Sequence, residues 1–133
     1  MAGNKYGARK IVDPATGYVF DSKKEYNRWC VLRIMERAGK ISDLKRQVKF
    51  ELIPTQRAAS TEVYKAGPQK GLPKPGAIIE KPCSYVADFT YKDSYGKLHV
   101  EDVKGYKKGA AFDLFVLKRK LMLFLKGISV EVT

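Results

Sequence analysis

The chain has 133 residues, of which 44% are hydrophobic and 30% are charged, a balance typical of a folded domain and unlike that of a disordered chain. Its 26 Lys and Arg outnumber 14 Asp and Glu, and the resulting net charge of +12 favours a polyanionic partner such as nucleic acid. No segment has the length of a membrane-spanning helix, and the N-terminus lacks a signal peptide's apolar stretch. We therefore expect a single cytoplasmic domain over residues 1–133, with no membrane partner.

Histidine and cysteine are scarce, and this excludes several kinds of chemistry. His99 is the one histidine, and Cys30 and Cys83 lie in unrelated sequence contexts. A structural zinc site or a histidine-metal nuclease needs several such ligands together. Any chemistry must therefore depend on carboxylates and lysines.

The first elements follow from turn residues and helical spacing. Residues 1–17 form a basic N-terminal segment that ends in a turn, and the short apolar run at 18–20 is either a strand or a docked extended segment. A capping-box pattern from Ser22 to Glu25 precedes apolar residues at helical spacing, and Gly39 supplies a C-terminal cap. We expect a helix over about 22–38.

The middle of the chain predicts three strands and a long insertion. Alternating apolar residues at 47–53 predict a strand with one buried face. Residues 54–83 are so rich in Gly and Pro that we expect a flexible loop or a hairpin arm, which either contacts the substrate or is disordered. The runs 84–92 and 98–104 flank a compact turn and predict a hairpin.

A second helix and a last strand complete the chain. The helix is expected over 111–126, with one apolar stripe made of Leu114, Leu117, Leu121 and Phe124. A short strand follows at 128–132 and is expected to pair in parallel through the helical crossover. The order α, β, β, β, α, β predicts an α/β (α+β) fold, a mixed central sheet flanked by helices.

The second strand of the hairpin carries a charged pair at the end of an apolar face. Because side chains alternate along a strand, Asp102 and Lys104 share the face of Val100. Glu101 shares the opposite face with His99, which we expect to be solvated. Parity therefore favours Asp102 over Glu101 as the functional acid, although Asp102 and Lys104 could instead form a structural ion pair.

Asp88 lies on the strand that pairs with the Asp102 strand, so two carboxylates and Lys104 are expected to converge. Mg²⁺ or Mn²⁺ takes such oxygen ligands together with water and phosphate oxygens. A metal held in this way activates water for phosphodiester hydrolysis, and Lys104 could orient that water. For Asp88 taken alone, a turn cap or a surface position is an equally good interpretation.

At this point the residues resemble a known family. Asp88 followed by Asp102-Val103-Lys104 on the next strand, after an acidic residue in an N-terminal helix, resembles the PD-(D/E)xK nuclease superfamily and its αβββαβ core. More narrowly, FDSKKEYNRW at 20–29, the stretch 44–54, YVADFTY at 85–91 and VEDVKG at 100–105 resemble the small phage-encoded endonuclease-like proteins known as DUF1064.

The resemblance implies residue roles. Asp88, Asp102 and Lys104 match the metal-binding and catalytic positions, and Glu25 matches a helix glutamate that supports the metal. Gln47 matches a position near the site. Two alternatives stay open, since a capping box alone would explain Glu25 and a strand-end surface amide would explain Gln47.

Basic residues near the second helix are candidate nucleic-acid contacts. A solvated helix face is the usual explanation for such a cluster, but the net charge favours phosphate contact. Lys118 falls on the line of Leu114 and Leu121, so we expect it to point toward the sheet. The candidates are Lys107, Lys108, Lys118, Arg119 and Lys120.

The sequence thus predicts a Mg²⁺- or Mn²⁺-dependent endodeoxyribonuclease. The resemblance implies a phage or prophage setting in a bacterial host and DNA, including branched recombination intermediates, as substrate. A homodimer would suit symmetric cutting of two strands. The rival hypotheses are a non-catalytic DNA-binding accessory protein of recombination or packaging, and a basic ribonucleoprotein-type binder.

Overall fold

The computed structural model describes residues 9–133, so the first eight residues of the basic segment at 1–17 lie outside the described part. Backbone contacts divide the chain into two compact units. The larger one comprises residues up to Lys49 together with Val86–Thr133, and the smaller one is Phe50–Tyr85. Whether residues 1–133 fold as a single domain stays a prediction.

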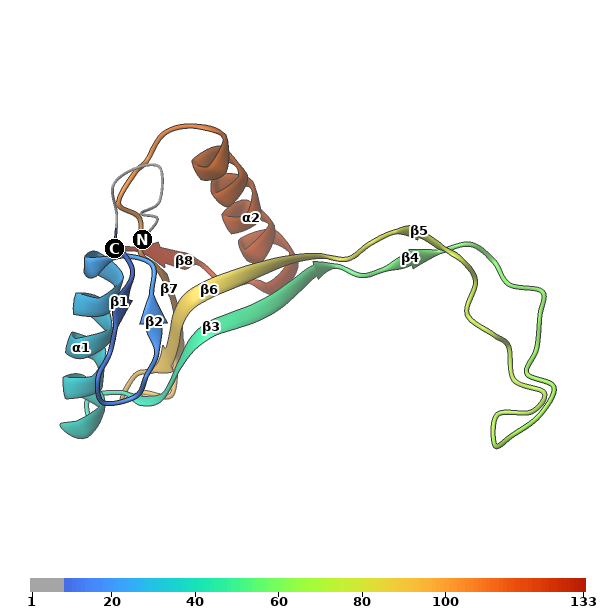
Figure 1. Ribbon diagram of the computed structural model, residues 1–133, viewed down its shortest axis with the longest axis horizontal. Helices are drawn as coiled ribbons and strands as arrows, with labels where there is room; N and C mark the ends of the chain where they lie inside the picture. Colours follow the sequence, from blue (N-terminus) through green and yellow to red (C-terminus); the bar gives the residue numbers. More distant parts are fainter. Residues whose placement is uncertain (1–8) are drawn as a thin grey trace. The chain divides into compact units, whose positions relative to one another are not determined.

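A mixed four-stranded sheet lies at the centre of the larger unit, with the strand order β3-β6-β7-β8 (Figure 1). β6 and β7 pair antiparallel with Thr90 opposite Val100, and β8 pairs in parallel with β7. This confirms the predicted mixed sheet and its parallel last strand. The strands are β3 (Ser42–Ile53), β6 (Cys83–Lys92), β7 (Leu98–Asp102) and β8 (Val130–Val132).

Two helices complete the predicted αβββαβ order. In α1 (Lys23–Arg37) the Ser22 side chain caps the N-terminus. α2 (Ala110–Lys126) ends at Gly127, whose left-handed conformation (φ 67°) is one that glycine adopts without strain. No helix in the described range is long and apolar enough to cross a membrane.

The core of the larger unit lies between α1 and one face of the sheet. Trp29 and Leu32 of α1 pack with Phe89 and Tyr91 of β6, and the Trp29 and Phe89 rings stack with centroids 6.1 Å apart. Phe20 is fully buried in the same cluster. It belongs to β2 (Val19–Phe20), which pairs with β1 (Ile11–Val12), so the apolar run at 18–20 is partly a strand.

The predicted core-facing stripe of α2 is wrong. Phe115 and Met122 are the buried residues of this helix, whereas Leu114, Leu117 and Phe124 are 53%, 54% and 85% exposed. The helix is apolar around most of its circumference, so hydrophobic spacing alone does not decide which face meets the sheet. Tertiary packing selects the line of Phe115 and Met122.

The smaller unit is a paired arm. β4 (Gln56–Arg57) and β5 (Ile78–Glu80) are antiparallel, and farther along the Tyr64 N–H donates to the Leu72 carbonyl at 3.0 Å. A Cβ on Gly76 would lie 1.8 Å from the Ala58 carbonyl oxygen, so this close approach requires glycine. Residues 54–83 therefore have the pairing expected of a hairpin arm.

Candidate active site

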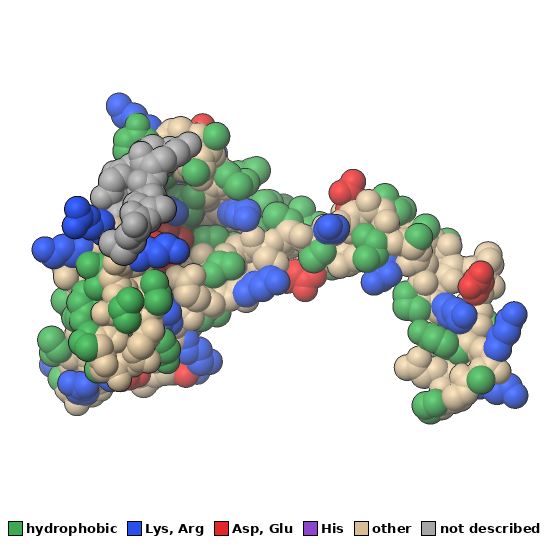
Figure 2. All heavy atoms as spheres, in the orientation of Figure 1, with side chains coloured by type: hydrophobic (Ala, Val, Ile, Leu, Met, Phe, Trp, Pro, Cys, Tyr) green, Lys and Arg blue, Asp and Glu red, His purple; other side chains and the backbone are tan. Residues whose placement is uncertain are grey.

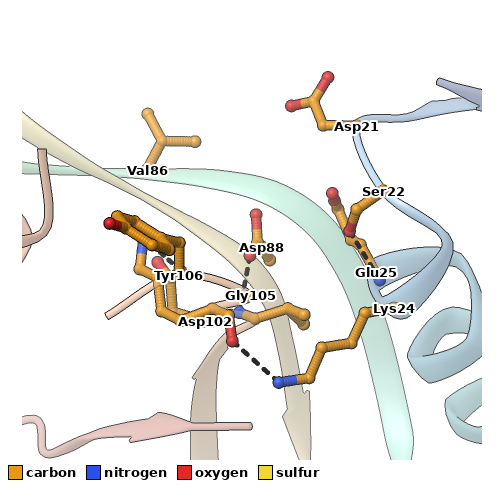
Figure 3. A pocket seen from close by; sticks show the side chains of 11 residues that line it. Asp21, Ser22, Lys24, Glu25, Val86, Asp88, Asp102, Gly105 and Tyr106 are labelled. Carbon is orange, nitrogen blue, oxygen red and sulfur yellow. Dashed lines mark hydrogen bonds and ion pairs between the residues drawn. The ribbon is translucent and has the colours of Figure 1, made fainter. Parts of the chain in front are cut away.

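A pocket of about 530 Å³ opens where the start of α1 meets the middle of β6 and the end of β7 (Figure 3). It is open to solvent on one side and has several charged groups in its wall. The lining residues are Asp21, Ser22, Lys24, Glu25, Val86, Asp88, Asp102, Val103, Lys104, Gly105 and Tyr106. All four predicted catalytic residues are among them.

Sheet register brings Asp88 and Asp102 together. Phe89 lies opposite Glu101 in the antiparallel β6–β7 pair, so one step further Asp88 and Asp102 face each other on the same side of the sheet. The Val103 N–H donates to Asp88 Oδ2 at 2.8 Å, and Lys104 Nζ lies 3.0 Å from Asp102 Oδ1. The predicted convergence of two carboxylates and a lysine is therefore present.

Glu25 takes part in both of its proposed arrangements. Its backbone N–H donates to Ser22 Oγ at 3.1 Å, which caps α1. Its side chain is buried in the pocket wall, where the carboxylate accepts a hydrogen bond from Gln47 Nε2 at 3.2 Å and lies 4.0 Å from Arg46 Nη2. The cap is formed by the backbone N–H of Glu25, so the carboxylate of Glu25 can line the pocket.

Gln47 joins two of the acids from an unusual backbone conformation. Its Nε2 donates to Asp88 Oδ1 as well as to Glu25 Oε1, both at 3.2 Å. Its φ of 53° lies in the left-handed region, which costs of order 1 kcal/mol for a non-glycine residue. This conformation occurs inside β3 and accompanies a side chain that reaches both acids.

The electrostatics of the pocket disfavour so much negative charge. Burial, followed by repulsion from Asp102 and then Glu25, raises the pKa of Asp88 to about 7. Burial and the nearby Asp21 carboxylate raise the pKa of Glu25. Hydrogen bonds from the Val103 N–H and the Gln47 side chain offset this effect for Asp88 only in part, so the pocket favours the neutral form of Asp88.

The donor set fits a hard divalent cation that keeps part of its water shell. Within residues 9–133 no three Asp, Glu, His or Cys side chains form a ready metal cage. Asp88 and Asp102 nevertheless present carboxylate oxygens from opposed strand positions. Mg²⁺ often binds through one or two carboxylates and completes its coordination with water and substrate phosphate.

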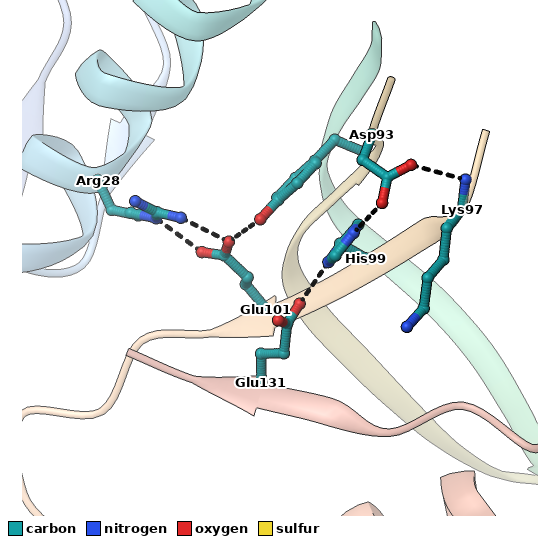
Figure 4. A network of polar contacts seen from close by, with 7 residues as sticks. Arg28, Asp93, Lys97, His99, Glu101 and Glu131 are labelled. Atoms are coloured by element: carbon teal, nitrogen blue, oxygen red, sulfur yellow. Dashed lines mark hydrogen bonds and ion pairs between the residues drawn. The ribbon is translucent and has the colours of Figure 1, made fainter. Parts of the chain in front are cut away.

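The opposite face of β7 carries a second buried acid (Figure 4). Glu101 is 2% exposed, and Arg28 of α1 binds it with Nε and Nη2 at 2.7 and 2.6 Å. The Tyr91 hydroxyl also donates to it. Burial would raise the pKa of Glu101, but the hydrogen bonds from Arg28 and Tyr91 outweigh burial and lower it.

The expectation that Glu101 and His99 share a solvated face is therefore wrong. Parity assigned the two faces of the strand correctly, but α1 covers the face that carries Glu101. His99 is half-buried, stacks on Tyr91, and holds Asp93 at 2.8 Å and Glu131 at 2.9 Å. These two carboxylates raise the pKa of His99.

The predicted phosphate contacts are distributed over the loop before α2 and over α2 itself. Lys107, Lys108 and Lys120 are exposed, and Lys107 follows the pocket residue Tyr106 directly. Lys118 and Arg119 are half-buried. The orientation of Lys118 was predicted from an apolar stripe that does not face the sheet. Lys118 nevertheless lies three residues after the buried Phe115 and four before the buried Met122, on the same side of α2. Phosphate binding by these residues stays a prediction.

Four residues at or near the pocket were not among the predicted site residues. Lys24 donates from Nζ to the Lys104 carbonyl at 2.8 Å, and Asp21 and Tyr106 line the pocket. Arg46 lies beside Glu25. Asp21 precedes the capping box and Lys24 lies within it, so their sequence position was a usable signal, whereas only tertiary contact identifies Arg46.

The fold and this pocket define a mixed α+β protein with a nuclease-like core arrangement and an acidic pocket at the end of β7. The chain belongs to the family described as "Protein of unknown function (DUF1064)", which matches residues 3–126. Neither the curated proteins nor the solved structures contain a match to it.

Proposed function

We propose that this protein is a Mg²⁺- or Mn²⁺-dependent DNA endonuclease of the PD-(D/E)xK type. The observation that carries the proposal is the convergence of Asp88, Asp102 and Lys104 with Glu25 in one pocket, from separate elements of the chain. Phage or prophage origin and branched recombination intermediates as substrate belong to the same proposal, through the resemblance of its sequence motifs.

Each residue has a chemical role in this proposal. Asp88 and Asp102 would hold the metal, which when bound polarises the phosphate and lowers the pKa of a coordinated water. Lys104, whose Nζ lies 3.0 Å from Asp102 Oδ1, would position the attacking water or neutralise charge on the phosphate. Glu25, linked to Asp88 through Gln47, would support this arrangement.

The charge of the protein supports a nucleic-acid substrate. At +12 it favours a polyanion, and the exposed Lys107 and Lys108 follow the pocket residues Gly105 and Tyr106. Lysine contacts to phosphate release counterions and give binding that weakens as salt rises. These residues would therefore contribute affinity without sequence preference.

A non-catalytic DNA-binding accessory protein is the second candidate. It is favoured by one observation, that the described residues lack a ready cage of three or more metal-binding side chains. Such a protein would bind DNA with the same cationic surface but without dependence on Asp102.

Cleavage assays separate the two candidates. Four-way-junction, flap, linear duplex and single-stranded DNA are incubated with wild type, Asp102→Asn and the control Asp43→Asn, with and without Mg²⁺ or Mn²⁺. Asp43 is an exposed carboxylate outside the pocket lining. We expect metal-dependent cleavage by wild type and the control, and a loss of about 10³-fold in Asp102→Asn. Cleavage that survives Asp102→Asn would contradict the site, and metal-independent binding without cleavage would favour the accessory protein.

A further inference from the structure

Helix α2 has more apolar surface than its own domain covers. Phe115 and Met122 are its buried residues, and Leu114, Leu117 and Phe124 are between 53% and 85% exposed. In the space-filling view, hydrophobic side chains gather over this helix (Figure 2). A helix that is apolar around most of its circumference is normally buried on more than one side.

Three exposed apolar residues of α2 and the half-buried Leu121 have the spacing of a helix-pairing seam. Leu114, Leu117, Leu121 and Phe124, here called the α2 stripe, are separated by three, four and three residues. Alternation of three and four is the a/d pattern with which one helix packs knobs-into-holes against another. The α2 stripe therefore fits a second helix better than a flat sheet.

The charges beside the α2 stripe make it complementary to itself. Asp113 precedes Leu114, in the g position of this pattern, and Lys118 follows Leu117 in the e position. In a parallel helix pair, g of one helix faces e of the next heptad in the other. Two copies of α2 would thus place Asp113 opposite Lys118 on both sides of the seam.

The area of the patch is also in the range that an interface needs. Leu114, Leu117, Phe124 and the neighbouring Leu125 together expose on the order of 500 Å² of apolar surface, at the upper end of what a soluble monomer leaves uncovered. A standard interface buries about 800 Å² on each partner, of which an apolar centre of this size would be the larger part.

From the exposure, spacing, charge and area we infer that the α2 stripe is the interface of a homodimer, in which α2 pairs in parallel with α2 of a second copy. The inference goes beyond the proposed nuclease activity and does not depend on it. Its test is the state of association of the full chain without DNA or metal, so its failure is distinguishable from a failure to cleave.

Sedimentation equilibrium over a range of protein concentrations tests the interface. Wild type is expected to reach twice the 15.0 kDa mass of one chain. Phe124→Lys and Leu117→Lys should each weaken dimerisation by about 30-fold or more, as expected for central apolar contacts.

Matched controls keep the experiment interpretable. Ile34→Lys places the same charge at a 63% exposed apolar position on α1 and should leave dimerisation unchanged. Circular dichroism of each variant checks folding. Phe124 is 85% exposed, so Phe124→Lys should disturb the fold less than Leu117→Lys. If Leu117→Lys unfolds, the result for Phe124→Lys decides the test.

A charge exchange tests the parallel arrangement. Asp113→Lys and Lys118→Asp should each dimerise more weakly alone, because each places like charges across the seam twice. Mixed together, the two variants should form a heterodimer more stable than either homodimer, because both charge pairs are then restored.

Three results would overturn the inference. Wild type that stays monomeric at every concentration would leave the α2 stripe to a different partner. A dimer that survives both lysine substitutions would place the interface elsewhere. An absence of preference for the mixed pair of charge variants would exclude the parallel arrangement.

Discussion

Glu101 and Asp102 are consecutive buried acids of β7 that point to opposite faces of the sheet, and the two side chains lie in different electrostatic environments. Glu101 is 2% exposed and Asp102 is 4% exposed. Glu101 meets a bidentate guanidinium and a tyrosine hydroxyl, and its pKa is lowered. Asp102 faces Asp88, whose pKa is raised to about 7.

The contrast separates a carboxylate whose charge is paired within the fold from a carboxylate that faces a like charge. The Arg28–Glu101 pair joins α1 to β7 and satisfies its own charge within the fold. The Asp88–Asp102 side brings like charges together, and this repulsion adds to burial in raising the pKa of Asp88. Raised pKa values such as those of Asp88 and Glu25 in an open pocket are typical of sites that bind a cation or move a proton.

The largest expected effect on stability comes from the face of β7 that carries Glu101. Glu101→Gln removes the charge that Arg28 pairs with and should lower the free energy of unfolding by about 3 kcal/mol, or roughly 10 °C in Tm. Thermal denaturation without metal measures this. Asp102→Asn is the matched control and should leave Tm unchanged or raise it, so an equal loss in both variants would contradict the contrast.

Divalent cations should stabilise the protein through the face of β7 that carries Asp102 and not through the face that carries Glu101. Mg²⁺ or Mn²⁺ at about 100-fold above its Kd should stabilise the wild type by about 2.7 kcal/mol, because a ligand of the native state shifts the unfolding equilibrium. Asp88→Asn should abolish this shift, and Asp43→Asn should retain it. A shift that persists in Asp88→Asn would place the cation outside the pocket.

The pH dependence of stability should reveal the crowding of acids directly. Between the usual pKa of 3.8 and the native value of about 7, native Asp88 keeps a proton that the unfolded chain has released. Stability contributed by that proton is complete below pH 3.8 and is lost as pH rises to about 7.

Asp88→Asn isolates this effect. Without metal at pH 8 it should exceed the wild type by about 2 kcal/mol, after allowance for solvent screening in the open pocket, and the difference should vanish at low pH. Denaturant titrations of both proteins across the pH range measure it. A difference that grows as pH falls would have the wrong sign for a raised pKa.

The smallest predicted effect concerns Gln47. Because its φ is 53°, Gln47→Gly should be more stable than Gln47→Ala by about 1 kcal/mol. At the exposed neighbour Lys49, where φ is not positive, the order should reverse. Equal stability of the two Gln47 variants would show that the strain at this position is relieved in solution.

Much of the fold and of the pocket follows from local sequence. The capping box set the start of α1, alternation set the buried face of β3, and the turn between β6 and β7 fixed the register that opposes Asp88 and Asp102. These features depend on side-chain periodicity and turn chemistry, which are properties of neighbouring residues. The same is true of the choice of Asp102 as the acid beside Lys104.

What the sequence by itself determined was the order of the elements and the direction of each strand side chain. Only the tertiary structure decided which directions are covered: that α1 lies over Glu101 and supplies Arg28, that α2 turns Phe115 and Met122 inward, and that Gln47 reaches two acids. Periodicity gives the face of an element on which a residue lies, whereas burial and charge compensation depend on what another element places against that face.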